Sequence, residues 1–294
     1  MGRDRRVGVL GQLIVSSRPI SWINTAFPFA AAYYLTSREI DVALMIGTLF
    51  FLIPYNLAMY GINDVFDYAS DVANPRKGGV EGALLAPTVH RTTLITAVAL
   101  AVPFVLVLVV LGSPASSLVL AVSLLAVAAY SVPGLRFKEI PFLDSVTSST
   151  HFVSPAVFGL VLAGAEFTPA LLAVLVAFFL WGIASHAFGA VQDIIPDREG
   201  QISSIATVLG ASRTVRFAFG AWLLAGLLML VTARPGPLAA LLVIPYLAAV
   251  APFWRLSDAQ SSNANLGWKR FLWINYAVGF FVTMLLIGYA AMTP

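Results

Sequence analysis

Two acidic clusters each follow a long apolar stretch of this chain. The first runs from Asn63 through Asp67 to Asp71, and the second joins Asp193 to Asp197. Residues four and eight positions apart lie on one face of a helix, so each cluster would present its oxygen atoms together. Such oxygens, where water can reach them, are the ligands that Mg²⁺ prefers, and the ion is usually shared with substrate phosphates. The spacing therefore indicates a site for divalent cations.

Basic residues suited to phosphate lie close to these clusters or between them in the chain. They are Arg18, Arg76, Lys77, Arg136, Lys138 and Arg198. Arginine can bind phosphate oxygens through two parallel N–H groups, whereas lysine acts as a point charge. The alternative is that basic residues only anchor helices at the membrane surface, and we prefer it for Arg3, Arg5, Arg6 and Arg255. For Arg76 and Lys138 we expect phosphate binding.

The composition indicates a membrane protein. The chain of 294 residues is 59% hydrophobic and 11% charged, with a mean hydropathy of +0.88. Soluble domains have about 25% charged residues, and a helix of about 20 apolar residues spans a bilayer. The expected spans are 20–37, 42–63, 93–112, 115–131, 143–164, 168–190, 214–232, 237–254 and 271–291. The sequence therefore predicts one all-α membrane domain over 1–294, with nine helices around a cavity. Prolines inside the spans, such as Pro54, are expected to kink them.

The basic residues also predict the orientation of the helices. With the N-terminus in the cytoplasm, all of the 17 Lys and Arg residues except Arg38 and Arg234 fall on the cytoplasmic side. An excess of basic residues in cytoplasmic loops favours this topology. The loops 64–92 and 191–213 are then both cytoplasmic, and each begins with an acidic cluster. An odd number of spans places the C-terminus on the opposite side.

Several classes of protein are disfavoured. The chain has no cysteine, which excludes disulfides, thiolate metal ligands and a cysteine nucleophile. Its basic residues are spread over five loops, which is weak evidence for nucleic-acid binding, and no cleavable signal peptide is expected. The acidic clusters have two other interpretations, as hydrated helix ends or as the ion site of a transporter. The grouping of these polar residues in two helically spaced sets disfavours the first, and a position at one membrane edge disfavours the second.

The motifs resemble those of a known family. Asn63, Asp67 and Asp71, with Asp193 and Asp197, resemble the two aspartate-rich motifs of the UbiA superfamily of intramembrane prenyltransferases, and the resemblance covers essentially the whole chain. Arg18-Pro19 followed by Trp22 and Asn24 resembles the family's entry to its first helix. The loop from Tyr130 to Lys138 resembles its Tyr-Ser-x-Pro loop. Residues 74–83 depart from the Arg-Pro-Leu-like stretch of many members. Together with 63–71 and 151–155, they resemble the lycopene elongases of C50 carotenoid biosynthesis.

The resemblance implies an enzyme that ionises an allylic diphosphate and transfers the prenyl group to a lipophilic acceptor. It implies Mg²⁺ as the cofactor, with Asn63, Asp67, Asp71, Asp193 and Asp197 as ligands. The implied catalytic residues are Asp67, Asp71, Asp193, Asp197 and Tyr130, with Tyr130 facing the carbocation. The implied diphosphate-binding residues are Asn63, Arg18, Arg76, Lys138 and Arg198. Asp64 lies about 100° round the helix from Asn63, so it is expected to be a neighbour of the ligands instead of a ligand.

The expected donor is dimethylallyl diphosphate, and the expected acceptor is lycopene or a C45 intermediate. Polar side chains in the spans are few, which agrees with a hydrocarbon acceptor. An aromatic or quinone prenyltransferase of the same fold and an ion-coupled transporter stay open as alternatives. We interpret His186 as a hydrogen-bonded packing residue, with removal of the final proton as the alternative. The expected location is the cell membrane, and contacts with other carotenoid-pathway enzymes are left open.

Overall fold

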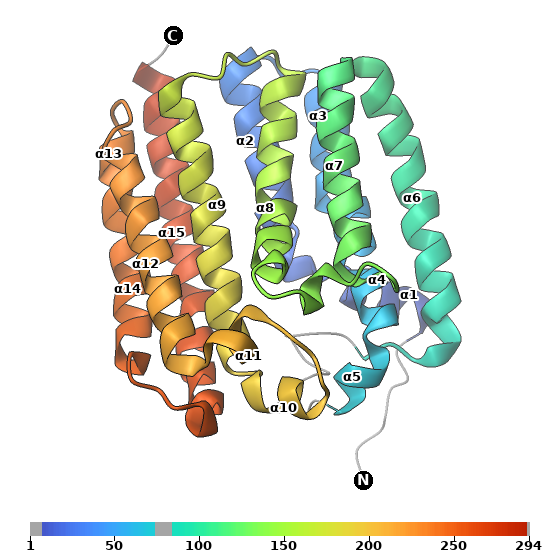
Figure 1. Ribbon diagram of the computed structural model, residues 1–294. Coiled ribbons are helices and arrows are strands. Elements are labelled where there is room, and N and C mark those ends of the chain that lie inside the picture. The colour runs from blue at the N-terminus through green and yellow to red at the C-terminus, as the bar shows by residue number, and fades with distance from the viewer. Residues whose placement is uncertain (1–7, 74–83, 293–294) are drawn as a thin grey trace. The chain divides into compact units, whose positions relative to one another are not determined.

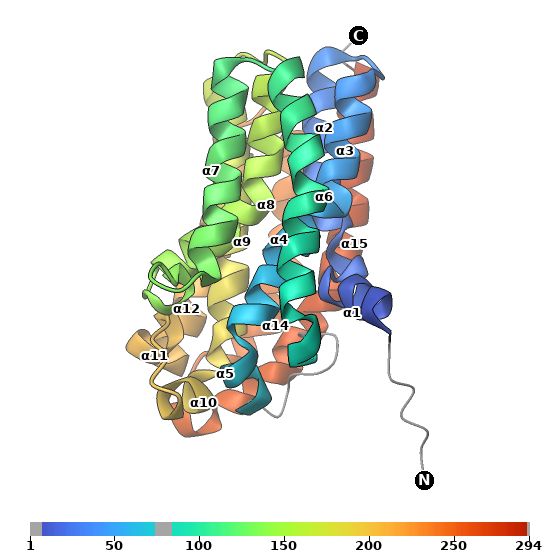
Figure 2. The same cartoon turned by 90° about the vertical axis from the view of Figure 1, so that its right-hand side faces the viewer.

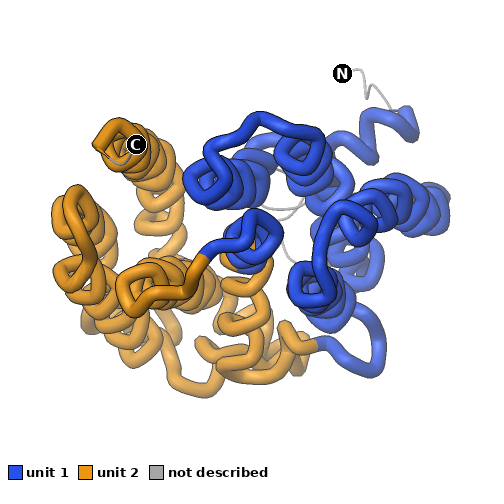
Figure 3. Tube along the Cα trace, turned by 90° about the horizontal axis from the view of Figure 1, so that it is seen from above, with its two compact units in different colours: residues 1–136, 154–165 blue, residues 137–153, 166–294 orange. Residues whose placement is uncertain are grey.

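A computed structural model describes residues 8–73 and 84–292 of this chain. Every regular element in these ranges is a helix (Figures 1 and 2), which confirms the all-α prediction for them. The chain divides into two compact units (Figure 3). Unit 1 comprises Met1–Arg136 and Ser154–Ala165, and unit 2 comprises Phe137–Val153 and Glu166–Pro294.

Unit 1 carries the first acidic cluster on a chain of consecutive helices. They are α1 (Val9–Ser16), η1 (Pro19–Ser21), α2 (Ile23–Ser37), α3 (Val42–Leu52), α4 (Pro54–Phe66), α5 (Tyr68–Ala73), η2 (Pro87–Val89), α6 (His90–Leu111), α7 (Pro114–Ser131) and the end of α8 (Leu143–Leu162). Helices α6 and α7 form an antiparallel pair (Figure 2). Ser113 begins α7 with a reciprocal capping box to Ser116, which satisfies backbone groups that the first turn leaves open.

The second predicted span, 42–63, is interrupted at Pro54, where the sequence predicts a kink. Helix α3 ends at Leu52 and α4 begins at Pro54, because proline has no N–H to continue the ladder. The amide of Asn56 donates to the carbonyl oxygens of Phe51 and Leu52, at 2.8 and 3.1 Å, and to Thr25 Oγ1 at 2.7 Å. Backbone groups freed inside a membrane must find partners within the protein, and Asn56 provides them here.

The core of unit 1 is aromatic. The ring of Phe29 lies 5.3 Å from that of Phe51 and 5.8 Å from that of Phe158, and Phe50 meets Phe51 edge-on at 4.9 Å. These rings are fully buried. Such pairs add about 0.5–1.5 kcal/mol each beyond the burial of their area. They fix α2, α3 and the end of α8 beside one another, and α4 continues from this core towards the first acidic cluster.

Unit 2 carries the second acidic cluster. Its elements are η3 (Phe137–Glu139), the beginning of α8, α9 (Pro169–Val191), α10 (Ile194–Glu199), α11 (Ile205–Leu209), α12 (Ala211–Met229), α13 (Gly236–Ala239), η4 (Ala240–Val243), α14 (Ile244–Val250), η5 (Ala251–Phe253), η6 (Asp258–Asn263) and α15 (Ala264–Met292). Trp222 of α12 stacks on Tyr246 at 5.4 Å and meets Phe188 of α9 edge-on at 6.2 Å. This aromatic packing holds α9 in place up to the point where the second cluster begins.

Seven helical stretches of the described residues are long and apolar enough to cross a membrane. They are Val42–Phe66, Pro87–Leu111, Pro114–Ser131, Leu143–Leu162, Pro169–Val191, Gly236–Phe253 and Asp258–Met292. The predicted spans 20–37 and 214–232 form the helices α2 and α12 but do not reach this standard. Helix α2 has 15 residues, fewer than the roughly 20 that a span needs, and α12 carries Arg213 and Arg216. The count of nine spans and the orientation therefore stay predictions.

Candidate active site

The first acidic cluster lies where a long helix changes into a short one. Helix α4 ends at Phe66, α5 begins at Tyr68, and Asp67 between them has φ −98° and ψ 0°. The i to i+4 backbone hydrogen bonds continue across this hinge, from Asp67 N to Asn63 O at 2.9 Å and from Asp71 N to Asp67 O at 2.8 Å. Asn63, Asp67 and Asp71 therefore lie one turn apart, as their spacing predicted. Asp67 and Asp71 are only 5% and 6% exposed.

Polar contacts orient the first two members of this cluster. The amide of Asn63 donates to Asp67 Oδ2 at 2.5 Å and to Ser131 Oγ at 2.9 Å. Nη2 of Arg136 lies 3.7 Å from Asp67 Oδ1. Ser131 and Arg136 come from the Tyr-Ser-x-Pro loop, so the structure brings that loop to the first acidic cluster within unit 1. Because Asn63 donates through its nitrogen, its amide oxygen is left to accept or to ligate.

The loop reaches Asp67 through an unusual backbone. Gly134 has φ +91°, and Arg136 itself has φ +43°. A residue with a side chain in the left-handed region costs of order 1–3 kcal/mol and persists where the surroundings hold it, often at functional sites. The sequence predicted Lys138 as the diphosphate-binding residue of this loop. The structure pairs Arg136 with Asp67 and places Lys138 in unit 2, where its predicted role stays a prediction.

Arg18 forms an ion pair with Asp64, the residue that follows Asn63. Its Nη2 lies 2.8 Å from Asp64 Oδ1, and the guanidinium stands 4.2 Å over the ring of Tyr60. Ser16 Oγ donates to Asp64 Oδ2 at 2.8 Å. The Asp64 side chain is fully buried, and that of Arg18 is 17% exposed. Arg18, predicted to bind diphosphate, is thus the ion-pair partner of Asp64, as suits the prediction that Asp64 is a neighbour of the ligands.

The second acidic cluster repeats the local geometry of the first. Helix α9 ends at Val191, Asp193 has φ −96° and ψ 0°, and the six-residue helix α10 follows. Asp197 N donates to Asp193 O at 2.9 Å, so the two aspartates lie one turn apart. The preceding Gln192 donates to Gly189 O at 3.0 Å and accepts from Asn265 at 2.6 Å. In each cluster a long helix, α4 or α9, is followed by a short helix, α5 or α10, and an aspartate, Asp67 or Asp193, lies between the two. We call these two aspartates the aspartate hinges.

Arg198, whose predicted role in diphosphate binding stays a prediction, is paired with Asp258. Its Nη1 lies 2.8 Å from Asp258 Oδ2, and Nη2 donates to Thr207 O at 2.8 Å. These contacts fasten α10 to η6 and α11. The other predicted cation, Arg76, lies with Lys77 outside the described residues, and their roles stay predictions.

The donors of both clusters fit a divalent cation shared with phosphates. Across residues 8–73 and 84–292, no three His, Cys, Asp or Glu side chains are arranged to hold a metal by themselves. Each cluster offers two carboxylates one turn apart, and the first adds the amide oxygen of Asn63. Mg²⁺ takes oxygen ligands, keeps several waters and is bound through one or two carboxylates with substrate phosphates. A pair of carboxylates in each cluster matches that demand.

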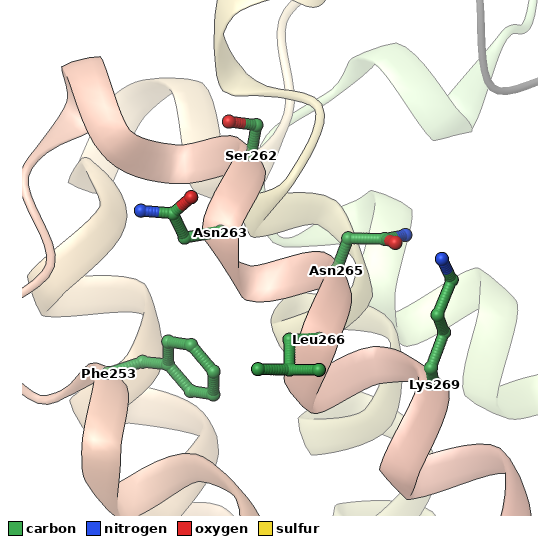
Figure 4. A pocket seen from close by; sticks show the side chains of 6 residues that line it. All are labelled: Phe253, Ser262, Asn263, Asn265, Leu266 and Lys269. Atoms are coloured by element: carbon green, nitrogen blue, oxygen red, sulfur yellow. The ribbon is translucent and has the colours of Figure 1, made fainter.

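A pocket in unit 2 lies beside the second cluster and was not foreseen from the sequence. It has a volume of about 360 Å³ and is lined by Phe253, Ser262, Asn263, Asn265, Leu266 and Lys269 (Figure 4). Asn265 connects it to Gln192, the residue before Asp193. The sequence placed Lys269 in a loop, but α15 already begins at Ala264. That helix carries Lys269 at the edge of the pocket, on the same side of α15 as Asn265 (Figure 4).

A family model and several known sequences match this chain. The model of the UbiA prenyltransferase family matches residues 25–275. A lycopene elongase/hydratase of Corynebacterium glutamicum is 51% identical over 276 residues, which are 94% of this chain and 96% of that protein. The C(50) beta-cyclic carotenoids biosynthesis protein LbtBC of a Dietzia species is 55% identical to this chain. The match covers 95% of this chain and 65% of the Dietzia protein. A Halobacterium salinarum lycopene elongase/hydratase is 36% identical over 84% of this chain and 88% of its own.

Solved structures share the fold. A UbiA homolog from Archaeoglobus fulgidus, bound to DMAPP and Mg²⁺, superposes with a TM-score of 0.64 at 17% identity over 91% of this chain and 98% of its own. An apo UbiA homolog from Aeropyrum pernix gives 0.63 at 21% identity over 90% of this chain and 99% of its own. At such identities the likeness concerns the fold.

Proposed function

Because this chain belongs to the UbiA prenyltransferase family, we propose that it elongates lycopene with a five-carbon prenyl group from dimethylallyl diphosphate, with Mg²⁺ as the cofactor. It is a multi-pass membrane prenyltransferase, and its relatives include lycopene elongases of C50 carotenoid biosynthesis. The transporter alternative is thereby set aside. We further propose nine spans in the cell membrane, with the N-terminus and both acidic clusters on the cytoplasmic side.

One observation carries the proposed chemistry. Asp67 and Asp71 are buried one turn apart beside the amide of Asn63, and Arg136 is held on Asp67. Buried carboxylates that keep their charge need partners such as cations and hydrogen-bond donors. A substrate diphosphate with its metal meets that need, and the family and the names of the relatives agree with it. We propose that Asp193 and Asp197 contribute in the same way.

The chain's own residues have distinct parts in this proposal. Asn63, Asp67, Asp71, Asp193 and Asp197 would hold the metal, and bound Mg²⁺ supplies neutralisation of the departing diphosphate. Arg136 and Lys138, with Arg76 and Arg198, add positive charge where the diphosphate leaves. Tyr130 offers a ring face to the allylic cation, an attraction of about 0.5–2 kcal/mol. The apolar helices keep water from the cation.

The acceptor is assigned as lycopene. The support is the name of the Corynebacterium relative, which is 51% identical over 94% of this chain, together with an apolar interior that suits a hydrocarbon. A lycopene end needs only an apolar channel, because its terminal double bond is the nucleophile. A phenolic or quinone acceptor would need polar groups placed to orient it.

The test is expression in a lycopene-producing bacterium that makes no longer carotenoids, with mass analysis of the pigments. We expect species heavier than lycopene by one and by two C5 units. Asp67→Asn should abolish them, since it removes a charge from the first cluster. Glu166→Gln, the same chemical change at an exposed position outside both clusters, should leave them intact.

Unchanged lycopene, with the wild-type protein present in the membrane, would contradict the acceptor and turn attention to aromatic acceptors. Washed membranes extend the test to the cofactor. Chelation should stop diphosphate release, and added Mg²⁺ should restore it. Release that continues in excess chelator would contradict the proposed metal.

A further inference from the structure

A buried polar group in unit 2 has no part in the function described so far. Ser145, near the start of α8, lies with its Oγ 3.0 Å from Nδ1 of His186 on α9. Asp144 and His151, also on α8, interact electrostatically with the same imidazole. Asp144, Ser145 and His151 are at most 3% exposed. Ionisable residues inside membrane helices are costly, and they point to function by default.

The backbone holds this group firmly. Asp144 Oδ2 accepts from Ile205 N at 2.7 Å and Oδ1 from Ser145 N at 2.6 Å, so the carboxylate is fixed at the start of α8. One turn further along α8, Ser149 donates to Phe179 O at 2.7 Å. A Cβ atom at Gly182 would collide with Ser149, so glycine there permits the close approach of α8 and α9. The position of Ser145 beside His186 therefore follows from packing.

His186 also lies in a chemically meaningful place along α9. It precedes Asp193 by seven residues, which is about 10 Å along a helix and within about 20° of the same face. The backbone turn continues to Asp193, whose N–H donates to Ala190 O at 3.1 Å. A donor whose diphosphate is bound at Asp193 and Asp197, as proposed above, would extend its C5 unit from the aspartates into the apolar helices, towards the acceptor double bond. For a donor bound in that way, His186, two turns before Asp193 on α9, would lie beyond the diphosphate on the side of the C5 unit.

The reaction needs a proton acceptor at that depth, if the chain acts as proposed above. The allylic C–O bond breaks and its electron pair leaves with diphosphate. The π electrons of the acceptor double bond form the new C–C bond, which leaves a positive charge on the adjacent acceptor carbon. The charge is removed when a neighbouring C–H pair forms a new double bond, or when water adds. Either ending releases one proton inside an apolar cavity.

We propose that His186 accepts this proton and that Ser145 positions its ring. In the tautomer whose Nδ1–H donates to Ser145 Oγ, Nε2 carries the lone pair that takes the proton. The imidazolium so formed lies within the field of Asp144, whose fixed carboxylate stabilises it. His186 is thus a catalytic residue of the second half of the reaction, after the diphosphate has left, and Ser145 is a positioning residue.

The test compares two products of the same membranes supplied with dimethylallyl diphosphate, lycopene and Mg²⁺. One is diphosphate, which reports ionisation, and the other is elongated carotenoid, which reports completion. General acid–base catalysis contributes about 10²–10⁴-fold. In His186→Gln we expect elongation to fall about 100-fold, with diphosphate release reduced much less. The amount of carotenoid formed per diphosphate then falls at least about tenfold, because allylic cations that are not carried on to the product are captured by water as a C5 alcohol after their diphosphate has been released.

Matched variants separate the chemical role from a structural one. His151→Gln makes the same change at the buried neighbouring histidine and should keep the wild-type ratio of carotenoid to diphosphate. Ser145→Ala should lower the ratio, and Ser145→Thr, which keeps the hydroxyl, should restore it. If His186→Gln does not accumulate in the membrane, the ratios of carotenoid to diphosphate in Ser145→Ala and Ser145→Thr test the proposal in its place.

Three results would overturn the proposal. An unchanged ratio in His186→Gln and Ser145→Ala, even with both products reduced, would leave these residues a packing role only. An equal fall of the ratio in His151→Gln would remove the assignment to His186. Wild-type membranes that release no diphosphate with these substrates would refute the proposed function itself, on which this inference rests.

Discussion

Asp67 and Arg136 form the contact on which the proposed donor site most depends. Arg136 reaches the carboxylate from a left-handed backbone, 3.7 Å away. Preorganised cations beside developing charge contribute about 10²–10³-fold to turnover. We expect Arg136→Gln to lower kcat/KM for the allylic diphosphate about 100-fold. The exposed Arg91 of α6 offers the matched control, Arg91→Gln, and an equal loss in both variants would refute a specific role for Arg136.

We expect the buried ion pair of Asp64 and Arg18 to contribute to the stability of the fold. Breaking a buried ion pair by removing one partner costs about 3–5 kcal/mol, because the other charge is left uncompensated. We expect Asp64→Asn to lower the free energy of unfolding in detergent by about 3 kcal/mol. A variant that unfolds like the wild type yet loses its response to Mg²⁺ would instead make Asp64 a metal ligand.

For individual residues, the sequence predicted which side chains belong to the candidate site better than it predicted which of them contact one another. The spacing of Asn63, Asp67 and Asp71 was enough to predict their common face. The spacing did not predict that Arg136, and not Lys138, would pair with Asp67, because this pairing depends on the left-handed turn at Gly134 and Arg136. Ser131, which accepts from Asn63, had a signal in the Tyr-Ser-x-Pro motif that went unused.

Among the elements, α3 begins with a charged cap that makes stability depend on pH. Leu44 N donates to Asp41 Oδ1 at 2.9 Å and Tyr33 to Oδ2 at 2.7 Å. These bonds, the backbone one first, hold the pKa of Asp41 below its usual value. A carboxylate with a lowered pKa adds stability above the pKa of the unfolded chain, and this is lost as pH falls through the lowered value.

Removing this cap should therefore matter less in acid. We expect Asp41→Ala to cost about 1 kcal/mol at neutral pH, the usual value of an N-cap. The difference from wild type should shrink as pH falls below the usual aspartate pKa of about 4. Asp41→Asn keeps a capping oxygen and controls for the charge. Unfolding curves in detergent at several pH values measure the effect, and a constant difference would contradict it.

The hinges show where helical periodicity stops being informative. Helical periodicity predicted that the aspartates would lie at the ends of two long helices, and α4 and α9 do lead directly to Asp67 and Asp193. It did not predict that Asp67 would cap the end of α4, or that Asp193 would cap the beginning of α10, each with ψ 0°. Apolar periodicity reports which face is buried, and an interruption of the helix at a polar residue leaves that face pattern intact.

For the whole molecule, the nine-span topology is the prediction most open to direct measurement. The chain has no cysteine, so single cysteines can be introduced at Glu166, Gln201 and Ala291 and labelled with a membrane-impermeant reagent. We expect Gln201→Cys to react from the cytoplasmic side, and Glu166→Cys and Ala291→Cys from the outside. Labelling of Gln201→Cys and Ala291→Cys from the same side would imply an even number of spans between these two positions, whereas the nine-span prediction has three.

Composition predicted the class of this molecule because the bilayer limits it to few architectures. Nearly continuous apolar runs left only a helical bundle. The span count is less secure, because α2 is short and α12 carries two arginines near its start. Such helices are stabilised by protein neighbours as much as by lipid. Trp222 of α12, fully buried against Tyr246, is an instance that hydropathy alone does not reveal.

The two aspartate hinges have a consequence for the thermodynamics of substrate capture. Each is followed by a helix of six residues, α5 or α10, and a helix that short gains little stability from its own hydrogen bonds. Segments that bind ligands tend to come from the part of a fold that opens most readily. If the donor binds at these turns as proposed, part of its intrinsic affinity would be offset by the cost of ordering them. A Kd for the donor would then understate the strength of the contacts themselves, and we expect a variant that rigidifies either turn to bind more tightly without a new contact.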